Sequence, residues 1–167
     1  MRFIGLRQLL SAMTAAGALA LGGCQMPSFG SFATPPPEPA LAPEVPATIR
    51  SEEIVGRWGG PTAYHDPSQR ARMEAKAKGL CGKPYVIGAG PNGGVMMHLA
   101  DQPQQQELRL KGGPGGKNYV GPPGQAGGPQ DREVVSFDGK VLVMRYIDTD
   151  VDGRYGTSIY VRCSPKA

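Results

Sequence analysis

From residue 84 onward, apolar residues occur in short runs separated by turn-forming residues. Six runs are rich in β-branched and aromatic residues, and each is bounded by Gly, Pro, Asn or Asp. They cover residues 84 to 88, 95 to 99, 107 to 111, 132 to 137, 140 to 147 and 157 to 163. This pattern predicts a mainly β domain, built as a small antiparallel barrel or sandwich.

Two of these runs indicate which side chains face the core. In residues 107 to 111 two leucines alternate with charged residues, so the leucines are expected inward and the charged residues outward: Glu107, Arg109 and Lys111. Residues 140 to 147 are apolar on both faces, as expected for a central strand or one that a helix partly covers. Asp138 and Gly139 predict a hairpin with a type I′ turn just before that run.

One short helix is predicted at about residues 67 to 78. Asp66 suits its N-cap, Pro67 its first position and Gly79 the residue past its end. Its apolar face is thin, so we expect it to lie on the surface of the β domain. No other segment carries comparable helix signals.

Residues 111 to 130 are rich in glycine and proline. Structureless segments of this length are usually mobile or functional, so we expect a flexible surface loop, with a binding loop as the alternative. At its centre, Tyr119 and Val120 could form a short strand, or Tyr119 could provide an aromatic binding contact.

The N-terminus has the features of an export signal. Arg2 and Arg7 are its only charges, and residues 11 to 21 are all small or apolar. A permanent membrane helix needs about 20 apolar residues, so this run is too short to span a bilayer. We therefore expect residues 1 to 23 to be a signal peptide that is removed.

Residues 21 to 24, LGGC, resemble the lipobox of bacterial lipoprotein precursors. The resemblance implies that Cys24 is acylated, for example with palmitate, and that the chain is cut just before it. Several acyl chains anchor a protein stably, since each buried CH₂ contributes about 0.8 kcal/mol. Gln25 stands where inner-membrane lipoproteins carry aspartate, which implies the outer membrane, with the domain in the periplasm or at the cell surface. An ordinary secretory peptide is the alternative, and it would leave Cys24 as a free thiol.

Residues 24 to 50 are expected to form a disordered tether after the lipid anchor. Their prolines fix φ and remove hydrogen-bond donors, and their apolar content is too low to offset the entropy of ordering. Such a tether is a semi-rigid spacer, although it could also cross peptidoglycan or dock on a partner. Residues 51 to 167 then form a single domain.

Charge and cysteine content narrow the possible partners and bonds. The chain carries +4, and loss of Arg2 and Arg7 leaves 16 basic against 14 acidic residues. The basic residues are too few and too scattered for a nucleic-acid-binding surface.

In an oxidising compartment, Cys81 and Cys163 are expected to form a disulfide. The loop of about 80 residues predicts roughly 4 kcal/mol of stabilisation. A zinc site, which lacks nearby histidines, and a reactive thiol are the alternatives.

Gly56 and Trp58 form a GxW motif that is similar to the one near the first strand of lipocalin-like barrels. Those barrels pack a basic side chain from the last strand over the tryptophan, which implies this role for Arg162. Small periplasmic protease-inhibitor lipoproteins also resemble the chain, since they combine a lipid anchor, a Pro-rich spacer, a barrel with an early GxW motif and one disulfide. Trp58, Arg162 and Tyr119 are therefore candidate binding residues, with Trp58 as a plain core residue the alternative.

The spacing of Asp148, Asp150 and Asp152 matches the first half of a calcium loop. The twelfth position is Ile159 rather than a bidentate glutamate, so an acidic hairpin turn is favoured and a weak Ca²⁺ site is the alternative. No other metal or cofactor is indicated.

The two histidines do not indicate catalysis. His65 and Asp66 are adjacent, so on an extended segment they would point to opposite sides. His98 is expected to be a strand residue that faces water. Since no catalytic motif is present, we expect a protein that is not an enzyme.

The sequence favours an outer-membrane lipoprotein whose non-enzymatic β domain binds another envelope protein or has a structural role. The bulky apolar residues look sufficient to fill a barrel of this size, which favours a binding module over a carrier. The alternatives are a lipocalin-like carrier of an apolar ligand and a protease inhibitor that inserts residues 44 to 52 into an active site.

Overall fold

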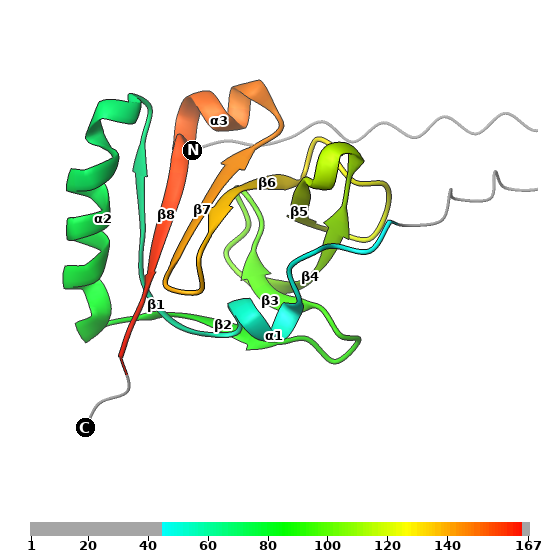
Figure 1. Cartoon of the computed structure of the whole chain (residues 1–167), viewed down its shortest axis with the longest axis horizontal. Helices are drawn as coiled ribbons and strands as arrows, with labels where there is room; N and C mark the ends of the chain where they lie inside the picture. Colours follow the sequence, from blue (N-terminus) through cyan, green and yellow to red (C-terminus); the bar gives the residue numbers. More distant parts are fainter. Residues whose placement is uncertain (1–44, 165–167) are drawn as a thin grey trace, which may run out of the picture. The chain divides into compact units, whose positions relative to one another are not determined.

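In the computed structural model, which describes residues 45 to 164, eight antiparallel strands form a closed barrel. Each strand pairs with the next one along the chain, and β8 pairs with β1 to close the ring (Figure 1). The strands are β1 Gly56–Tyr64, β2 Tyr85–Ala89, β3 Val95–His98, β4 Gln105–Gly112, β5 Asn118–Gly121, β6 Arg132–Phe137, β7 Val141–Tyr146 and β8 Thr157–Arg162. The predicted mainly β architecture is confirmed. The predicted signal peptide, Cys24 and most of the tether lie outside the described residues.

The predicted surface helix is present as a 3₁₀ turn, η1 (Pro67–Gln69), that runs into helix α2 (Arg70–Gly79). The Asp66 carboxylate accepts a hydrogen bond from the Ser68 N–H at 2.9 Å, which is the predicted cap. α2 lies along β1 and β8 on the outside of the barrel (Figure 1). Its Ala77 is buried in a cluster with Tyr64, Val143 and Ile159. α2 therefore covers part of one face of the 140 to 147 run, at Val143, which is one of the two arrangements expected for it.

Four further helical segments were not predicted. They are α1 (Ser51–Ile54), η2 (Leu80–Gly82), η3 (Pro114–Gly116) and α3 (Thr149–Tyr155). The two α-helices lie at opposite ends of the barrel, α1 at the lower end and α3 at the upper end in Figure 1.

Gly59 lets α2 approach β1 closely. A Cβ at this position would lie 2.1 Å from the Ala77 carbonyl oxygen and 3.2 Å from the Cys81 sulfur. Gly59→Ala is therefore expected to push the helix away and to lower the free energy of unfolding by about 1–3 kcal/mol, as overpacking does. Urea unfolding followed by the fluorescence of Trp58, the only tryptophan, measures this change.

Gly79→Ala is the matched control for that substitution. Gly79 ends the same helix, and a Cβ there meets nothing within 4 Å. We expect it to keep or slightly raise the unfolding midpoint, because alanine loses less entropy than glycine in helical backbone. Equal midpoints for the Gly59 and Gly79 variants would show that the close approach of α2 does not depend on the glycine.

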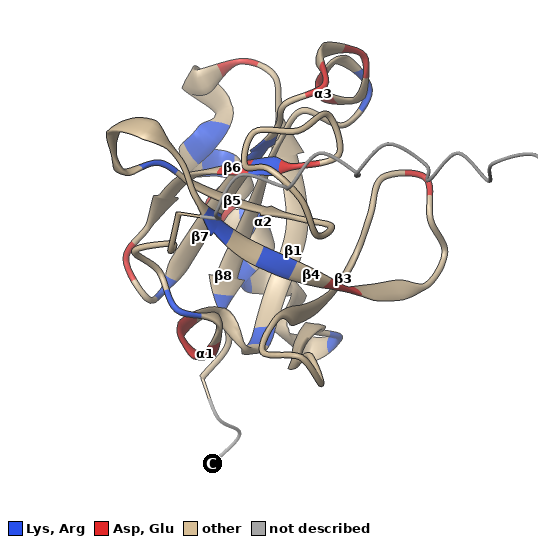
Figure 2. Cartoon of the chain, turned by 90° about the vertical axis from the view of Figure 1, so that its right-hand side faces the viewer, with Lys and Arg blue, Asp and Glu red and all other residues tan. Residues whose placement is uncertain are grey.

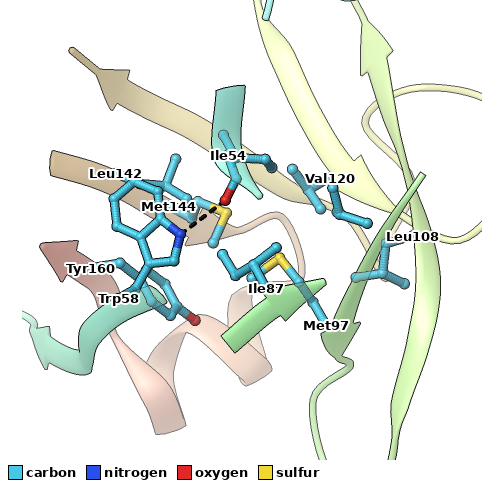
Figure 3. Packing of buried hydrophobic residues seen from close by; sticks show 10 residues of the cluster. Ile54, Trp58, Ile87, Met97, Leu108, Val120, Leu142, Met144 and Tyr160 are labelled. Atoms are coloured by element: carbon cyan, nitrogen blue, oxygen red, sulfur yellow. Dashed lines mark hydrogen bonds between the residues drawn. The ribbon is translucent and has the colours of Figure 1, made fainter. Parts of the chain in front are cut away.

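The lower end of the barrel is filled and closed. Ile54 of α1 and Trp58 of β1 are fully buried in one cluster with Leu142 and Met144 (Figure 3). The Trp58 indole N–H donates to the Ile54 carbonyl at 2.9 Å, which ties α1 across the end of the barrel. The expectation that bulky residues fill the interior holds for this half of the barrel.

Arg162 lies over the face of Trp58, with its guanidinium carbon 4.2 Å from the ring centroid. This is the contact that the resemblance to lipocalin-like barrels implies. The same guanidinium donates to the carbonyls of Gly139 at 2.7 Å and Val55 at 3.1 Å, and to that of Glu53. Arg162 therefore joins the β6–β7 turn and the α1 region to the end of β8.

The predicted disulfide between Cys81 and Cys163 is present, with a sequence separation of 82 residues. It links η2, which follows α2, to the chain just after β8. The Cys163 N–H also donates to the Arg57 carbonyl at 2.9 Å. The bond therefore holds the C-terminal end of the barrel against β1 and its helix.

The prediction of a structureless loop at residues 111 to 130 is wrong in part. β5 lies inside this segment and pairs with both β4 and β6, which confirms the alternative of a short strand at Tyr119 and Val120. The expected outward exposure of Lys111 is also wrong, because residues 122 to 131 fold over its side chain. Its ammonium lies 2.7 Å from the Asp131 carboxylate, and both side chains are at most 3 % exposed.

The β6–β7 hairpin is confirmed, but its turn is not type I′. Type I′ requires positive φ at both central residues, and among the described residues Gly139 has φ 83° whereas Asp138 does not have a positive φ. The Asp138 carboxylate instead accepts hydrogen bonds from the N–H groups of Lys140 and Val141. The aspartate side chain thus closes the turn in place of a second left-handed residue.

The folded domain begins before residue 51, the predicted boundary. Val45 forms a β-bridge with Gly112, and the Asn118 side-chain oxygen accepts hydrogen bonds from the N–H groups of Thr48 and Ile49 at 2.7 and 3.3 Å. The last six residues of the predicted tether are therefore part of the domain.

Candidate ligand-binding site at the barrel mouth

The upper end of the barrel is lined differently from the filled lower end. Here β1 and β7 end and β6 and β8 begin, and α3 forms part of the rim (Figure 1). A pocket of about 360 Å³ opens at this end, lined by aromatic and small side chains and one arginine: Pro61, Thr62, Ala63, Tyr85, His98, Leu99, Arg132, Tyr146, Tyr155, Ser158 and Tyr160. None of these lining residues is acidic.

Arg132 is the first residue of β6 and lies directly opposite Tyr146 of β7. Side chains of directly opposed residues share one face of a sheet, and here that face is the interior of the barrel. A register irregularity between Val134 and Ser136 then shifts the alternation of β6. As a result Phe137 also packs on the interior cluster, although it is five positions after Arg132 and strict alternation would place the two on opposite faces.

The Arg132 side chain is held in place but incompletely satisfied. The residue is 3 % exposed, its Nη2 donates to the His98 carbonyl at 2.8 Å, and its guanidinium carbon lies 5.6 Å from the centroid of the Tyr146 ring. Its Nε is buried and has no hydrogen-bond partner among residues 45 to 164. A buried charged donor without an acceptor is costly, so the Arg132 guanidinium would be stabilised by a ligand that brings an acceptor into the pocket.

Tyrosine and histidine side chains form the wall beside Arg132. The Tyr85 hydroxyl accepts a hydrogen bond from the His98 N–H at 3.0 Å and lies 3.1 Å from Nδ1 of the same histidine. Tyr85 also packs against Tyr160, with ring centroids 5.6 Å apart. Burial raises the pKa of Tyr160 well above its usual range, against the opposing effect of the Arg132 charge, so its hydroxyl stays protonated. The prediction that His98 simply faces water is corrected, because its ring is half-buried against Tyr85.

α3 is fastened to the opposite rim through Asp101. The Arg154 guanidinium donates to both oxygens of this carboxylate at 2.8 and 3.0 Å, and the Tyr155 hydroxyl donates to it as well. The hydrogen bond from Arg154, followed by that from Tyr155, lowers the pKa of Asp101. Figure 2 shows the acidic and basic residues of α3 at this end of the molecule. The contact holds Tyr155 at the edge of the pocket.

The acidic segment predicted as a hairpin turn is instead the start of α3. The Asp148 carboxylate is the N-cap and accepts from the N–H groups of Asp150 and Val151 at 2.9 and 3.0 Å. Because helical geometry spreads the three aspartates, they do not converge on one point. The described part of the chain contains no group of three or more His, Cys, Asp or Glu side chains that could hold a metal ion. The alternative of a weak Ca²⁺ site at Asp148, Asp150 and Asp152 therefore finds no support.

The predicted binding residues lie away from the barrel mouth. The structure brings Trp58 and Arg162 together at the closed end, where their contacts hold the fold. Tyr119 lies on β5, is 8 % exposed and approaches Gly113 and Gly127. The predicted lipidation site Cys24 lies outside the described residues. The sequence interpretation missed Arg132, whose only signal was a charged residue at the start of a strand.

Comparison with protein-family models, with curated proteins and with solved structures finds no match for this chain. Within residues 45 to 164, no helix is both long enough and apolar enough to cross a membrane.

Proposed function

We propose that this protein is a non-enzymatic, outer-membrane-anchored binding protein whose barrel holds a small ligand at its mouth. The anchor is the acylated thiol of Cys24, and the tether that follows holds the domain away from the lipid surface. The main support for a binding role is the difference between the two ends of the barrel. At one end α1 and Trp58 close the barrel interior, and the hollow of about 500 Å³ there is a surface hollow beside Glu52, Glu53 and Arg162. The other end opens into a pocket of about 360 Å³ that is lined by tyrosines and Arg132.

Ligand sites in proteins are typically concave and lined by apolar and aromatic groups, with a few polar groups that orient the ligand. The mouth pocket fits this description, because it combines four tyrosines with one histidine and one arginine. Its volume is at the lower end of the range for such sites, so the ligand is small. Of the functions that the sequence favours, the lipocalin-like carrier is thus supported best, with the ligand in the mouth and the lower half filled.

The proposal of an envelope-protein partner has less support from the described surface. The exposed large apolar residues are spread over five different segments: Val45, Leu80, Val86, Val135 and Tyr155. Protein-binding faces usually gather such residues into one patch. For the protease inhibitor, residues 45 to 49 would have to leave their partners Gly112 and Asn118 to enter an active site.

The full-length, lipidated protein tests this proposal when it is purified from its own envelope in mild detergent and extracted for mass spectrometry. We expect a small molecule that is released only on unfolding. Ala63→Trp should abolish its recovery, because Ala63 is exposed and lines the pocket, where an indole would occupy the space.

Ala89→Trp is the matched control, since Ala89 is an exposed alanine on β2 and does not line the pocket. It should retain the molecule. A stoichiometric protein partner that both variants retain, with no small molecule in the extract, would overturn the proposal in favour of an envelope-protein-binding module.

A further inference from the structure

Arg132 differs from the other buried charged residues of the domain. Three charged side chains are buried among residues 45 to 164: Lys111, Asp131 and Arg132. Lys111 and Asp131 neutralise each other at 2.7 Å. Arg132 forms no ion pair with any described residue, and its Nε has no acceptor there. The positive charge at the barrel mouth is therefore unbalanced.

None of the residues that line the pocket with Arg132 is a carboxylate that could balance its charge. Asp101 at the rim is engaged by Nη1 and Nη2 of Arg154, and Asp131, the neighbour of Arg132 in the chain, is paired with Lys111. The His98 carbonyl and the Tyr146 ring interact with the guanidinium as dipole and quadrupole, and neither carries a charge. A buried guanidinium in these conditions is stabilised most by an anion with oxygen acceptors.

Tyr160, whose hydroxyl stays protonated, lines the same pocket as Arg132 and offers a second donor there. A carboxylate or phosphate oxygen at the guanidinium would thus meet one charged and one neutral donor. Beyond these donors, the rings of Tyr85 and Tyr146 line the pocket. A flat aromatic body suits such a wall, because aromatic rings favour offset or edge-to-face contacts.

We propose that the mouth pocket binds a small aromatic oxyanion, with its charged group on Arg132 and Tyr160 and its ring among the pocket tyrosines. This inference rests on the proposed function, because it names the ligand class of the same site. Carboxylates and phosphate monoesters share the required chemistry, and Arg binds both through parallel N–H donors. The neutral amide of the same ring lacks the charge and is expected to bind poorly.

Isothermal titration calorimetry on the full-length lipidated protein in mild detergent, freed of co-purified ligand, tests the inference with three probes. Benzoate and phenyl phosphate carry the oxyanion, and benzamide has the same ring without the charge. We expect at least one anion to bind at least tenfold more tightly than benzamide. Tighter binding of benzoate would assign a carboxylate ligand, and tighter binding of phenyl phosphate would assign a phosphate ester.

Arg132→Gln is expected to weaken binding of the preferred anion at least tenfold and to leave benzamide binding unchanged. Arg145→Gln is the matched control, because Arg145 belongs to the same hairpin but lies outside the barrel, where it pairs with Glu133 at 2.9 Å. That variant should bind the anion like the unmodified protein. Far-ultraviolet circular dichroism checks that both variants are folded.

Equal affinities for the anions and benzamide in the unmodified protein would overturn the oxyanion inference, and this comparison needs no variant. So would failure of all three probes to bind. In either case the proposed function still depends on its own test, which is the molecule recovered from the envelope and its loss in the Ala63 variant.

Discussion

Lys111→Met is expected to lower the free energy of unfolding by about 3–5 kcal/mol, the usual cost of removing one partner of a buried ion pair. The Lys111 ammonium donates to the Asp131 carboxylate at 2.7 Å and to the carbonyls of Pro122 and Gln125 at 2.9 and 3.2 Å. The other Asp131 oxygen accepts from the N–H groups of Gly127 and Gly128. Methionine keeps the length of the side chain, so the loss isolates the charge and its hydrogen bonds.

The effect is large because Asp131 would remain buried and charged at 1 % side-chain exposure. Its Oδ1 lies so close to Gly121 of β5 that a Cβ there would be 1.8 Å away, so the carboxylate is packed against the strand. The double variant Lys111→Met with Asp131→Leu should recover part of the lost stability, because no uncompensated charge is left. Recovery stays partial, because the loop N–H and carbonyl groups that the pair satisfies lose their partners.

Urea unfolding measured through Trp58 fluorescence compares these variants with Lys117→Met. Lys117 forms an ion pair with Glu133 at 3.0 Å, but its side chain is 53 % exposed. Exposed pairs contribute about 0–1 kcal/mol, so this control should scarcely move the midpoint. Equal losses for Lys111→Met and Lys117→Met would show that the segment over Lys111 does not depend on the buried pair.

The double variant Cys81→Ser with Cys163→Ser is expected to lose about 4 kcal/mol of stability. The disulfide closes a loop of 82 residues. The chain-entropy model predicts a stabilisation of about this size, because the bond lowers the entropy of the unfolded chain. The native contacts at both ends persist without the bond, including the hydrogen bond from the Cys163 N–H to Arg57. We therefore expect the variant to fold at low temperature and to unfold at a lower urea concentration.

Dithiothreitol gives an independent measurement of the same quantity. It should shift the unfolding midpoint of the unmodified protein to that of the double variant and leave the midpoint of the variant unchanged. If reduction leaves the unmodified protein as stable as before, the bond contributes nothing to the stability of the barrel and the entropic argument is wrong for it.

Local signals in the sequence determined several elements correctly. The helix after Asp66 follows from its capping residue and Pro67, whose conformational preferences depend only on nearby backbone. Most strands follow from alternating apolar residues, and the Cys81–Cys163 bond follows from an even cysteine pair in an oxidising compartment. In the same way, Cys24 and its lipid anchor are a prediction from the N-terminal sequence alone.

Contacts between segments that are distant in the sequence determined the elements that local signals did not predict. β1 was suggested only through its GxW motif, because GRWGGPTAY is rich in glycine and proline, and it is a strand because β2 and β8 pair with it. Burial of Lys111 required residues 122 to 131 to fold over it. The start of α3 looked like a turn, since an aspartate such as Asp148 can cap a helix or close a turn with the same hydrogen bonds.

The candidate site depends most on tertiary structure. Strict alternation counted back from the inward Phe137 would place Arg132 outside the barrel, because the two residues are five positions apart. The irregularity between Val134 and Ser136 reverses that assignment and brings the guanidinium inside. The sequence by itself indicated most of the strands, the helix after Asp66 and the disulfide, and it predicts a lipid anchor at Cys24. Only the closed barrel, with its irregular register, decided that one end is filled and that the other holds an unpaired arginine.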